Sequence, residues 1–168
     1  MTRFLAPGLL VAAILGSAFA AAPKAAPCSG SQLAGTFSVV RGSAGAGNIS
    51  YRLALKNVSG SACTVTGLPR GRLLSRTGKP LPTHVRAAFP GSLTAVLVRL
   101  APGAHASATA RFSRDVPGVG EPVAGLRCGP TAYWLRVAAP GGGTTRAKVA
   151  PATPVCEHGR LLFTAYRR

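Results

Sequence analysis

The residues of this chain with the most defined chemistry are its four cysteines, Cys28, Cys63, Cys128 and Cys156. In an oxidising compartment an even set of cysteines is typical of disulfides, and four cysteines allow three pairings. Among these we favour Cys28–Cys63 with Cys128–Cys156, because each bond ties together neighbouring parts of the chain. A metal site is the alternative, but the chain has no Cys-x-x-Cys pair and Cys156-Glu157-His158 has no second ligand pair nearby. The sequence therefore predicts two structural disulfides and no bound metal.

Apart from the cysteines, the chain has few residues of the types that catalysis most often uses. They are the histidines and acids His84, His105, His158, Asp115, Glu121 and Glu157. The histidines match no metal-ligand spacing, and no Gly-x-Ser-x-Gly motif is present. Nothing in the spacing of the acids brings two carboxylates together, and no glycine-rich run leads into a helix that would bind phosphate. We therefore expect a protein that is not an enzyme and has no cofactor.

The amino terminus has the pattern of a secretory signal. Arg3 precedes an uncharged apolar run over residues 4–22, and Ala18-Phe19-Ala20 fits the small-residue rule for cleavage. The alternative is an uncleaved membrane anchor, which Pro7-Gly8 disfavours because both residues weaken a spanning helix. We predict a cleavable signal peptide over 1–20. The product would be soluble, without a membrane span, and secreted, periplasmic or part of the cell envelope.

After the signal, the sequence is typical of a β-sandwich. We expect a short flexible lead-in over 21–27 and a single domain over 28–168. Within the domain, short apolar runs alternate with Gly, Pro and Ser breakers at intervals of about 8 to 12 residues, and helical periodicity is absent. The pattern predicts an all-β, immunoglobulin-like sandwich of about seven to nine short strands, held by the two disulfides.

The strands themselves follow from a period of two. The positions expected to face the core are Phe37, Val39, Tyr51, Leu53, Leu55, Val96, Val98, Leu100, Ala106, Ala108, Ala110, Phe112, Tyr133, Leu135 and Val137. Leu73-Leu74 is expected to end a strand that enters a tight turn over 76–79, and the last strands are predicted over 146–149 and 160–166. Residues between the inward positions, Trp134 among them, would face solvent.

Charge is the strongest compositional signal of the chain. Twenty Lys and Arg residues stand against three acids, for a formal net charge of +17. Such a field favours anionic partners, for which an anionic cell-wall polymer and an acidic protein are the candidates. The alternative is that the gene comes from a GC-rich genome, whose codon bias raises the content of Arg and Ala without any functional cause. Codon bias does not explain the scarcity of acidic residues.

A basic surface is the candidate site. Its predicted residues are Arg52, Lys56, Arg70, Arg72, Arg76, Lys79, Arg99, Arg111, Trp134 and Arg136. Outward cations beside an exposed aromatic ring can hold an anionic polymer by charge and stacking. The alternatives are ordinary solvation of outward strand positions and, for Trp134, a place in the core in a different register. A second function, from another class, is a secreted protease inhibitor that presents the arginine of Leu68-Pro69-Arg70-Gly71 on an exposed loop.

Several motifs of the chain resemble one known family. They are Gly-Ser-Ala-Gly-Ala-Gly-Asn over 42–48, Leu55-Lys56-Asn57-Val58-Ser59-Gly60, Cys63-Thr64-Val65-Thr66-Gly67-Leu68-Pro69, Leu100-Ala101-Pro102-Gly103 and Cys128-Gly129-Pro130. Together they resemble the bacterial exported domain of unknown function 4232, over about residues 28–166. The resemblance implies an exported β-sandwich with disulfides. It transfers no activity, substrate or catalytic residue.

Overall fold

The computed structural model describes residues 25–92, 95–122 and 128–168, and strands make up about half of it. The expected signal peptide over 1–20 lies outside the described residues. In chain order the elements are η1 (Gly30–Gln32), β1 (Leu33–Val39), β2 (Asn48–Asn57), β3 (Cys63–Val65), β4 (Arg70–Leu74), β5 (His84–Ala87), η2 (Pro90–Ser92), β6 (Val98–Leu100), β7 (His105–Ser113), β8 (Thr131–Ala138), β9 (Thr144–Pro154), η3 (Glu157–Gly159) and β10 (Arg160–Phe163).

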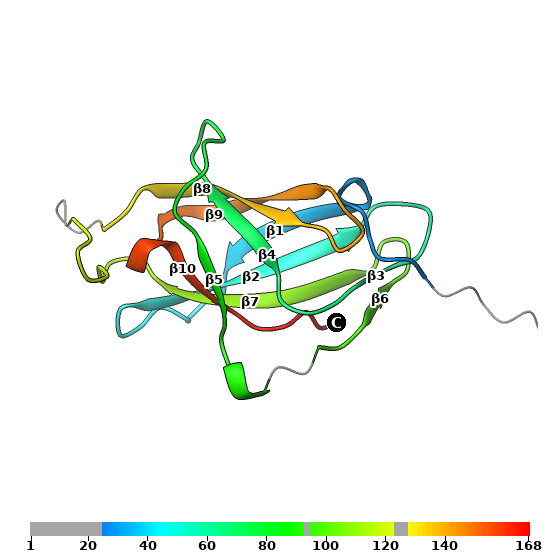
Figure 1. Ribbon diagram of the computed structural model, residues 1–168, viewed down its shortest axis with the longest axis horizontal. Coiled ribbons are helices and arrows are strands. Elements are labelled where there is room, and N and C mark those ends of the chain that lie inside the picture. The colour runs from blue at the N-terminus through cyan, green and yellow to red at the C-terminus, as the bar shows by residue number, and fades with distance from the viewer. Residues whose placement is uncertain (1–24, 93–94, 123–127) are drawn as a thin grey trace, which may run out of the picture.

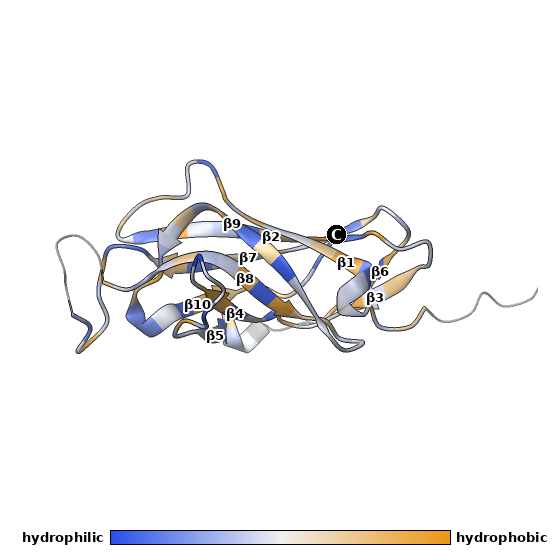
Figure 2. Ribbon diagram, turned by 90° about the horizontal axis from the view of Figure 1, so that it is seen from above, coloured by the Kyte–Doolittle hydropathy of each residue, from blue (hydrophilic) through white to orange (hydrophobic). Residues whose placement is uncertain are grey.

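Eight of the strands form one sheet in the order β4-β8-β9-β1-β2-β7-β10-β5, and β3 pairs with β6 in a small second sheet. The large sheet curls, so that β9, β1 and β2 lie in one layer while its outer strands β4, β10 and β5 lie in the other (Figures 1 and 2). The free edge of β4 is covered by the segment before β5, where the Leu81 N–H donates to the Leu73 carbonyl at 2.9 Å. The all-β prediction is confirmed, with ten strands in the described part of the chain rather than seven to nine.

The core lies between the two layers and is centred on aromatic rings. Tyr51 packs on Phe37 and Phe112, with ring centroids 5.1 and 5.2 Å apart, and Phe163 lies 6.1 Å from Phe37. All four side chains are almost completely buried. Burial of such a side chain contributes roughly 1.5 to 3 kcal/mol, so this cluster supplies much of the driving force that holds the layers together.

Two inward positions were predicted wrongly. Val96 is 52% exposed, because β6 begins only at Val98. Tyr133 is half-buried at the surface, because the β8–β9 ladder shifts register between Ala132 and Trp134 and Ala132 takes the inward place. An extra residue in a strand reverses the alternation, and a period of two cannot reveal it.

Both predicted disulfides are present, Cys28–Cys63 and Cys128–Cys156. Cys28 also donates its N–H to the Thr64 carbonyl at 2.9 Å and accepts from the Gly141 N–H at 2.8 Å. The end of the expected flexible lead-in is paired as well, because the Thr64 N–H donates to the Ala26 carbonyl at 2.9 Å. The first described residues thus connect the small sheet to the β8–β9 turn.

Gly141 is the position where this connection is most sensitive to a side chain. A Cβ at Gly141 would overlap the Pro27 carbonyl oxygen and lie 2.9 Å from that of Cys28, whereas a Cβ at Gly60 would meet nothing within 4 Å. We predict that Gly141→Ala lowers the free energy of unfolding by about 1 to 3 kcal/mol, as overpacking does, while Gly60→Ala leaves it nearly unchanged. Urea denaturation of the two variants measures this, and equal midpoints would contradict the tight packing at Gly141.

Candidate anion-binding surface

Three arginines lie side by side across neighbouring strands. Arg136 of β8 is directly opposite Arg72 of β4 on one side and Arg146 of β9 on the other. Directly opposite residues of antiparallel strands share a face of the sheet, with Cβ atoms about 5 Å apart. Arg72 and Arg146 are exposed and Arg136 is half-buried. We call these three residues the arginine row.

The register that creates the arginine row is set by the opposite face of the same strands. One residue along, Leu73, Leu135 and Ala147 are also directly opposite one another, and all three are almost completely buried. A slip by one residue would turn these side chains out of the core. The row is therefore imposed by the core, although like charges directly opposite each other destabilise a sheet by up to about 1 kcal/mol per pair.

None of the acids of the chain lies on β4, β8 or β9. Asp115 lies 3.7 Å from the Nε of Arg114, and Glu157 forms a two-pronged ion pair with Arg160 at 2.6 and 2.9 Å. The third acid, Glu121, bonds to backbone N–H groups and lies near His158. The charge of the arginine row is thus left for solvent or for a bound anion to balance.

Aromatic side chains adjoin the row. Trp134 is half-buried on the outward face of β8, directly opposite Lys148 of β9. The neighbouring Tyr133 carries the guanidinium of Arg76 over its ring, 4.8 Å from the ring centroid. Such cation–π contacts contribute roughly 0.5 to 1 kcal/mol at exposed sites and hold the guanidinium in place.

The predicted basic residues fall into several groups. The first group lies around β4 and β8 and consists of Arg72, Arg76, Trp134 and Arg136. The turn that contains Lys79 lies beside this group. Its Gly78 is close to Arg146, because a Cβ at Gly78 would lie 4.0 Å from an Nη of that arginine. A second group, Arg52, Lys56 and Arg111, shares the outward face of β2 and β7. Arg99 lies apart in β6, opposite Thr64, and Arg70 is exposed at the start of β4.

Sequence reasoning missed Arg146 and Lys148 as members of the site. Both lie at outward positions of β9, and their alternation with Ala147 and Val149 was visible in the predicted strand 146–149. What the sequence did not reveal is that β9 pairs with β8, and only that pairing brings Arg146 beside Arg136.

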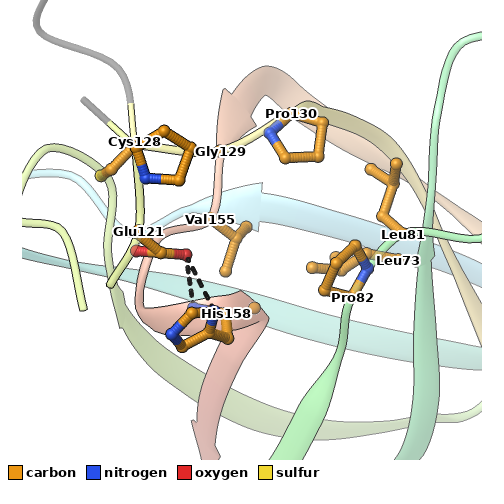
Figure 3. Close-up of a pocket in the computed structure, with 11 residues that line it drawn as sticks. Leu73, Leu81, Pro82, Glu121, Cys128, Gly129, Pro130, Val155 and His158 are labelled. Atoms are coloured by element: carbon orange, nitrogen blue, oxygen red, sulfur yellow. Dashed lines mark hydrogen bonds and ion pairs between the residues drawn. The ribbon is translucent and has the colours of Figure 1, made fainter. Parts of the chain in front are cut away.

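A separate, more enclosed pocket of about 200 Å³ lies where η3 meets the β4–β5 connection (Figure 3). Its lining is mostly apolar and includes Leu73, Pro82 and Val155, with Glu121 and His158 on one wall. Among the described residues no group of three or more His, Cys, Asp or Glu side chains could hold a metal ion. In the same part of the chain, no helix is long and apolar enough to cross a bilayer.

The side chain of Glu121 is hydrogen-bonded to the backbone around this pocket. Its carboxylate accepts from the N–H groups of Gly118 and Glu157, both at 2.7 Å, and from that of His158. Burial alone raises the pKa of Glu121, but the three N–H donors and the nearby His158 outweigh burial and hold the pKa below its ordinary value. Glu157 and His158 have φ angles of 54° and 57°, a left-handed conformation that these donated bonds stabilise. Glu121 thus fastens the loop after β7 to η3.

A lowered pKa makes this fastening dependent on pH. Because the folded state holds the Glu121 proton less tightly than the unfolded state, the stabilisation is complete above the ordinary pKa of 4.5 and is lost as pH falls below it. We predict that Glu121→Gln costs about 1 to 3 kcal/mol at pH 7 and flattens the acid limb of the stability profile. Urea denaturation from pH 3 to about pH 7 measures this, and identical acid limbs in the two proteins would contradict it.

Repulsion within the arginine row predicts a stabilising substitution. Arg136→Thr removes the central charge and introduces a good strand former, so we expect a gain of about 0.5 to 1 kcal/mol at low ionic strength. The gain should shrink in about 1 M NaCl, where the screening length is about 3 Å. Arg52→Thr is the control, since Arg52 is directly opposite the uncharged Ser38 and Thr109. An equal response of both variants to salt would argue against repulsion within the row.

Comparison with known proteins identifies the family of this chain. No curated protein and no solved structure matches the chain. A family model does match, over residues 28–167, which contain all four cysteines and every strand described above. The match spans most of the chain and agrees with the resemblance carried by the sequence motifs. The chain belongs to the family described as domain of unknown function (DUF4232).

Proposed function

We propose that this chain is an exported, non-catalytic domain that binds an anionic polymer through the arginine row. The observation that carries the proposal is the direct register of Arg72, Arg136 and Arg146, with no acid on their strands. Folding requires only that outward strand positions be polar, so three adjacent arginines exceed that requirement. A phosphate placed between two guanidinium groups turns their mutual repulsion into shared attraction.

Phosphate is the anionic group that the row fits best. The planar guanidinium donates two parallel N–H bonds to a phosphate or carboxylate, which a lysine ammonium cannot do. A polymer also gains from the release of its condensed counterions, and this gain grows with each contact. The net charge of +17 adds a long-range field that raises the rate of association with such a polymer.

Export and the disulfides agree with a partner outside the cytoplasm. Disulfides persist mainly in oxidising compartments, and the predicted signal peptide over 1–20 would deliver the chain there. Among the partners considered, a phosphate-rich wall polymer offers repeated charges at close spacing, as the row requires. An acidic protein is the alternative, and it would present carboxylates in place of phosphates.

The protease-inhibitor hypothesis receives no support from the geometry. Arg70 and Gly71 are the first residues of β4, directly opposite Ala138 and Val137 of β8. An inhibitor of the kind considered would need this arginine on a free, exposed loop. We therefore propose no inhibitory function for residues 68–71.

Binding to long-chain inorganic polyphosphate, measured over a range of NaCl concentrations, tests the proposal. We predict that Arg72→Gln/Arg136→Gln/Arg146→Gln weakens binding at least about tenfold and reduces the salt slope by about 2, at about 0.7 per lost contact. The matched control is Arg52→Gln/Lys56→Gln/Arg111→Gln, which removes the same charge from β2 and β7. Its effect should be several-fold smaller.

Three results would contradict the proposal. Equal weakening by the two triple variants would mean that net charge alone governs binding. Binding that does not respond to salt would exclude the electrostatic mechanism. Tighter binding of poly-glutamate than of polyphosphate, at matched charge, would favour an acidic protein over a phosphate polymer.

A further inference from the structure

The ladder between β8 and β9 opens next to the arginine row. Ala132 is opposite Thr153 and Trp134 is opposite Lys148, so residues 149–152 of β9 stand against the single residue Tyr133 of β8. The alternation of β9 fails in the same place, where Ala150, Pro151 and Ala152 are all exposed. Such irregularities re-aim side chains and are frequent beside functional sites.

The opening forms a groove of about 460 Å³, which we call the aromatic groove. Its lining consists of Arg76, Tyr133, Trp134, Lys148 and residues 149–152 of β9. Two aromatic side chains come from β8, small apolar residues come from β9, and two cations complete the set. Its volume falls within the range of small-molecule sites, and this mixture of apolar lining and a few polar groups is typical of them.

Contacts on both sides of the groove hold its walls. Arg76 is fixed over the Tyr133 ring and also lies within 3.4 Å of the Tyr133 hydroxyl through an Nη. On the other wall, the carbonyl of Pro151 accepts a hydrogen bond from the hydroxyl of Tyr51 at 2.9 Å, and the Tyr51 ring is fully buried in the core. The groove is therefore anchored to the core, which lowers the entropy lost on binding.

The aromatic groove and the arginine row are continuous. Along β8, Trp134 is followed on the same face by Arg136, and along β9, Lys148 is preceded on that face by Arg146. The turn over 75–79, which carries Arg76, projects from the end of β4 beside β8 (Figure 1). A polymer held on the row thus has one of its units beside Trp134.

We propose that the aromatic groove binds one sugar unit of a glycan whose units are joined by phosphodiesters. The less polar face of the sugar ring packs against Trp134 and against the part of the Tyr133 ring that the Arg76 guanidinium leaves uncovered. The adjoining phosphate accepts from Arg76 and Lys148. This inference rests on the proposed function, because it names the polymer that the arginine row would hold. Phosphate alone would not need an apolar, aromatic lining, and a neutral glycan would not need the two cations.

A single-stranded nucleic acid offers the same combination of rings and phosphates, but the arrangement favours a glycan. Proteins that bind single strands stack successive bases on several aromatic side chains along a basic groove. Tyr133 and Trp134 are half-buried, and the exposed aromatic side chain among the described residues is Phe89, on the connection between β5 and β6. One groove therefore fits one ring, with charge on either side.

Trp134 makes the test direct, because it is the only tryptophan of the chain and it lines the groove, so its fluorescence reports on binding there. The probes are a synthetic oligomer of hexose units joined by phosphodiesters, inorganic polyphosphate and oligothymidylate, all at equal charge and ionic strength. We expect the hexose oligomer to bind at least about fivefold more tightly than polyphosphate and to shift the Trp134 emission with saturation.

Variants separate the groove from the row. Tyr133→Ala and Tyr133→Leu should each remove the preference for the hexose oligomer and leave polyphosphate binding within about twofold of the parent, because neither substitution changes the charge of the surface. Phe89→Ala is the matched aromatic control and should change neither. Tyr133→Leu keeps an apolar side chain at this half-buried position, so it keeps the test valid if Tyr133→Ala fails to fold.

The outcomes distinguish this inference from the proposed function. Equal binding of the hexose oligomer and polyphosphate, both lost in the arginine-row variant, would overturn the glycan groove and leave the anion-binding function standing. Tighter binding of oligothymidylate than of the hexose oligomer would overturn the inference in favour of a nucleic acid. Absence of binding to every polyanion would overturn both.

Discussion

Burial of one cross-strand row of small and aliphatic side chains is the constraint on which the rest of the structure depends. Leu73, Leu135, Ala147 and Gly35 follow one another across β4, β8, β9 and β1, and a Cβ at Gly35 would come within 3.0 Å of that of Ala147. Burial of each leucine contributes roughly 1.5 to 3 kcal/mol, which exceeds the repulsion of up to about 1 kcal/mol between neighbouring arginines on the other face. The core therefore sets the register, and the register sets the arginine row.

Covalent and polar contacts hold both ends of this sheet. The small β3–β6 sheet, fastened by Cys28–Cys63, lies at one end of the long axis, and η3 lies at the other (Figure 1). Cys128–Cys156 and the Glu121 carboxylate both bind the segment that enters η3. In the chain-entropy account, loops with separations of 35 and 28 residues give bonds worth about 3 to 4 kcal/mol each. A basic surface held in this way loses little conformational freedom when it binds a partner.

Much of this fold could be predicted from the sequence, and the part that could not is long-range pairing. Alternation placed Phe37, Tyr51 and Leu135 in the core, and the pairing favoured among the three that four cysteines allow is the one observed. Alternation within one strand does not say which strand lies beside it, so Arg146 was not connected with Arg136. The irregularity at Tyr133 and the bonds from Glu121 to a backbone 36 residues away depend on the assembled structure, and no local signal marks either.

Binding of phosphate by the arginine row is measured most directly by an NMR titration of the arginine Nε–Hε signals with inorganic polyphosphate. Charge-assisted bonds to phosphate shift these signals, and each arginine reports on its own site. We predict the largest and earliest shifts at Arg72, Arg136 and Arg146, with smaller shifts at Arg52 and Arg111 on the β2–β7 face. Equal shifts at all five arginines, or larger shifts at Arg52 and Arg111, would contradict it.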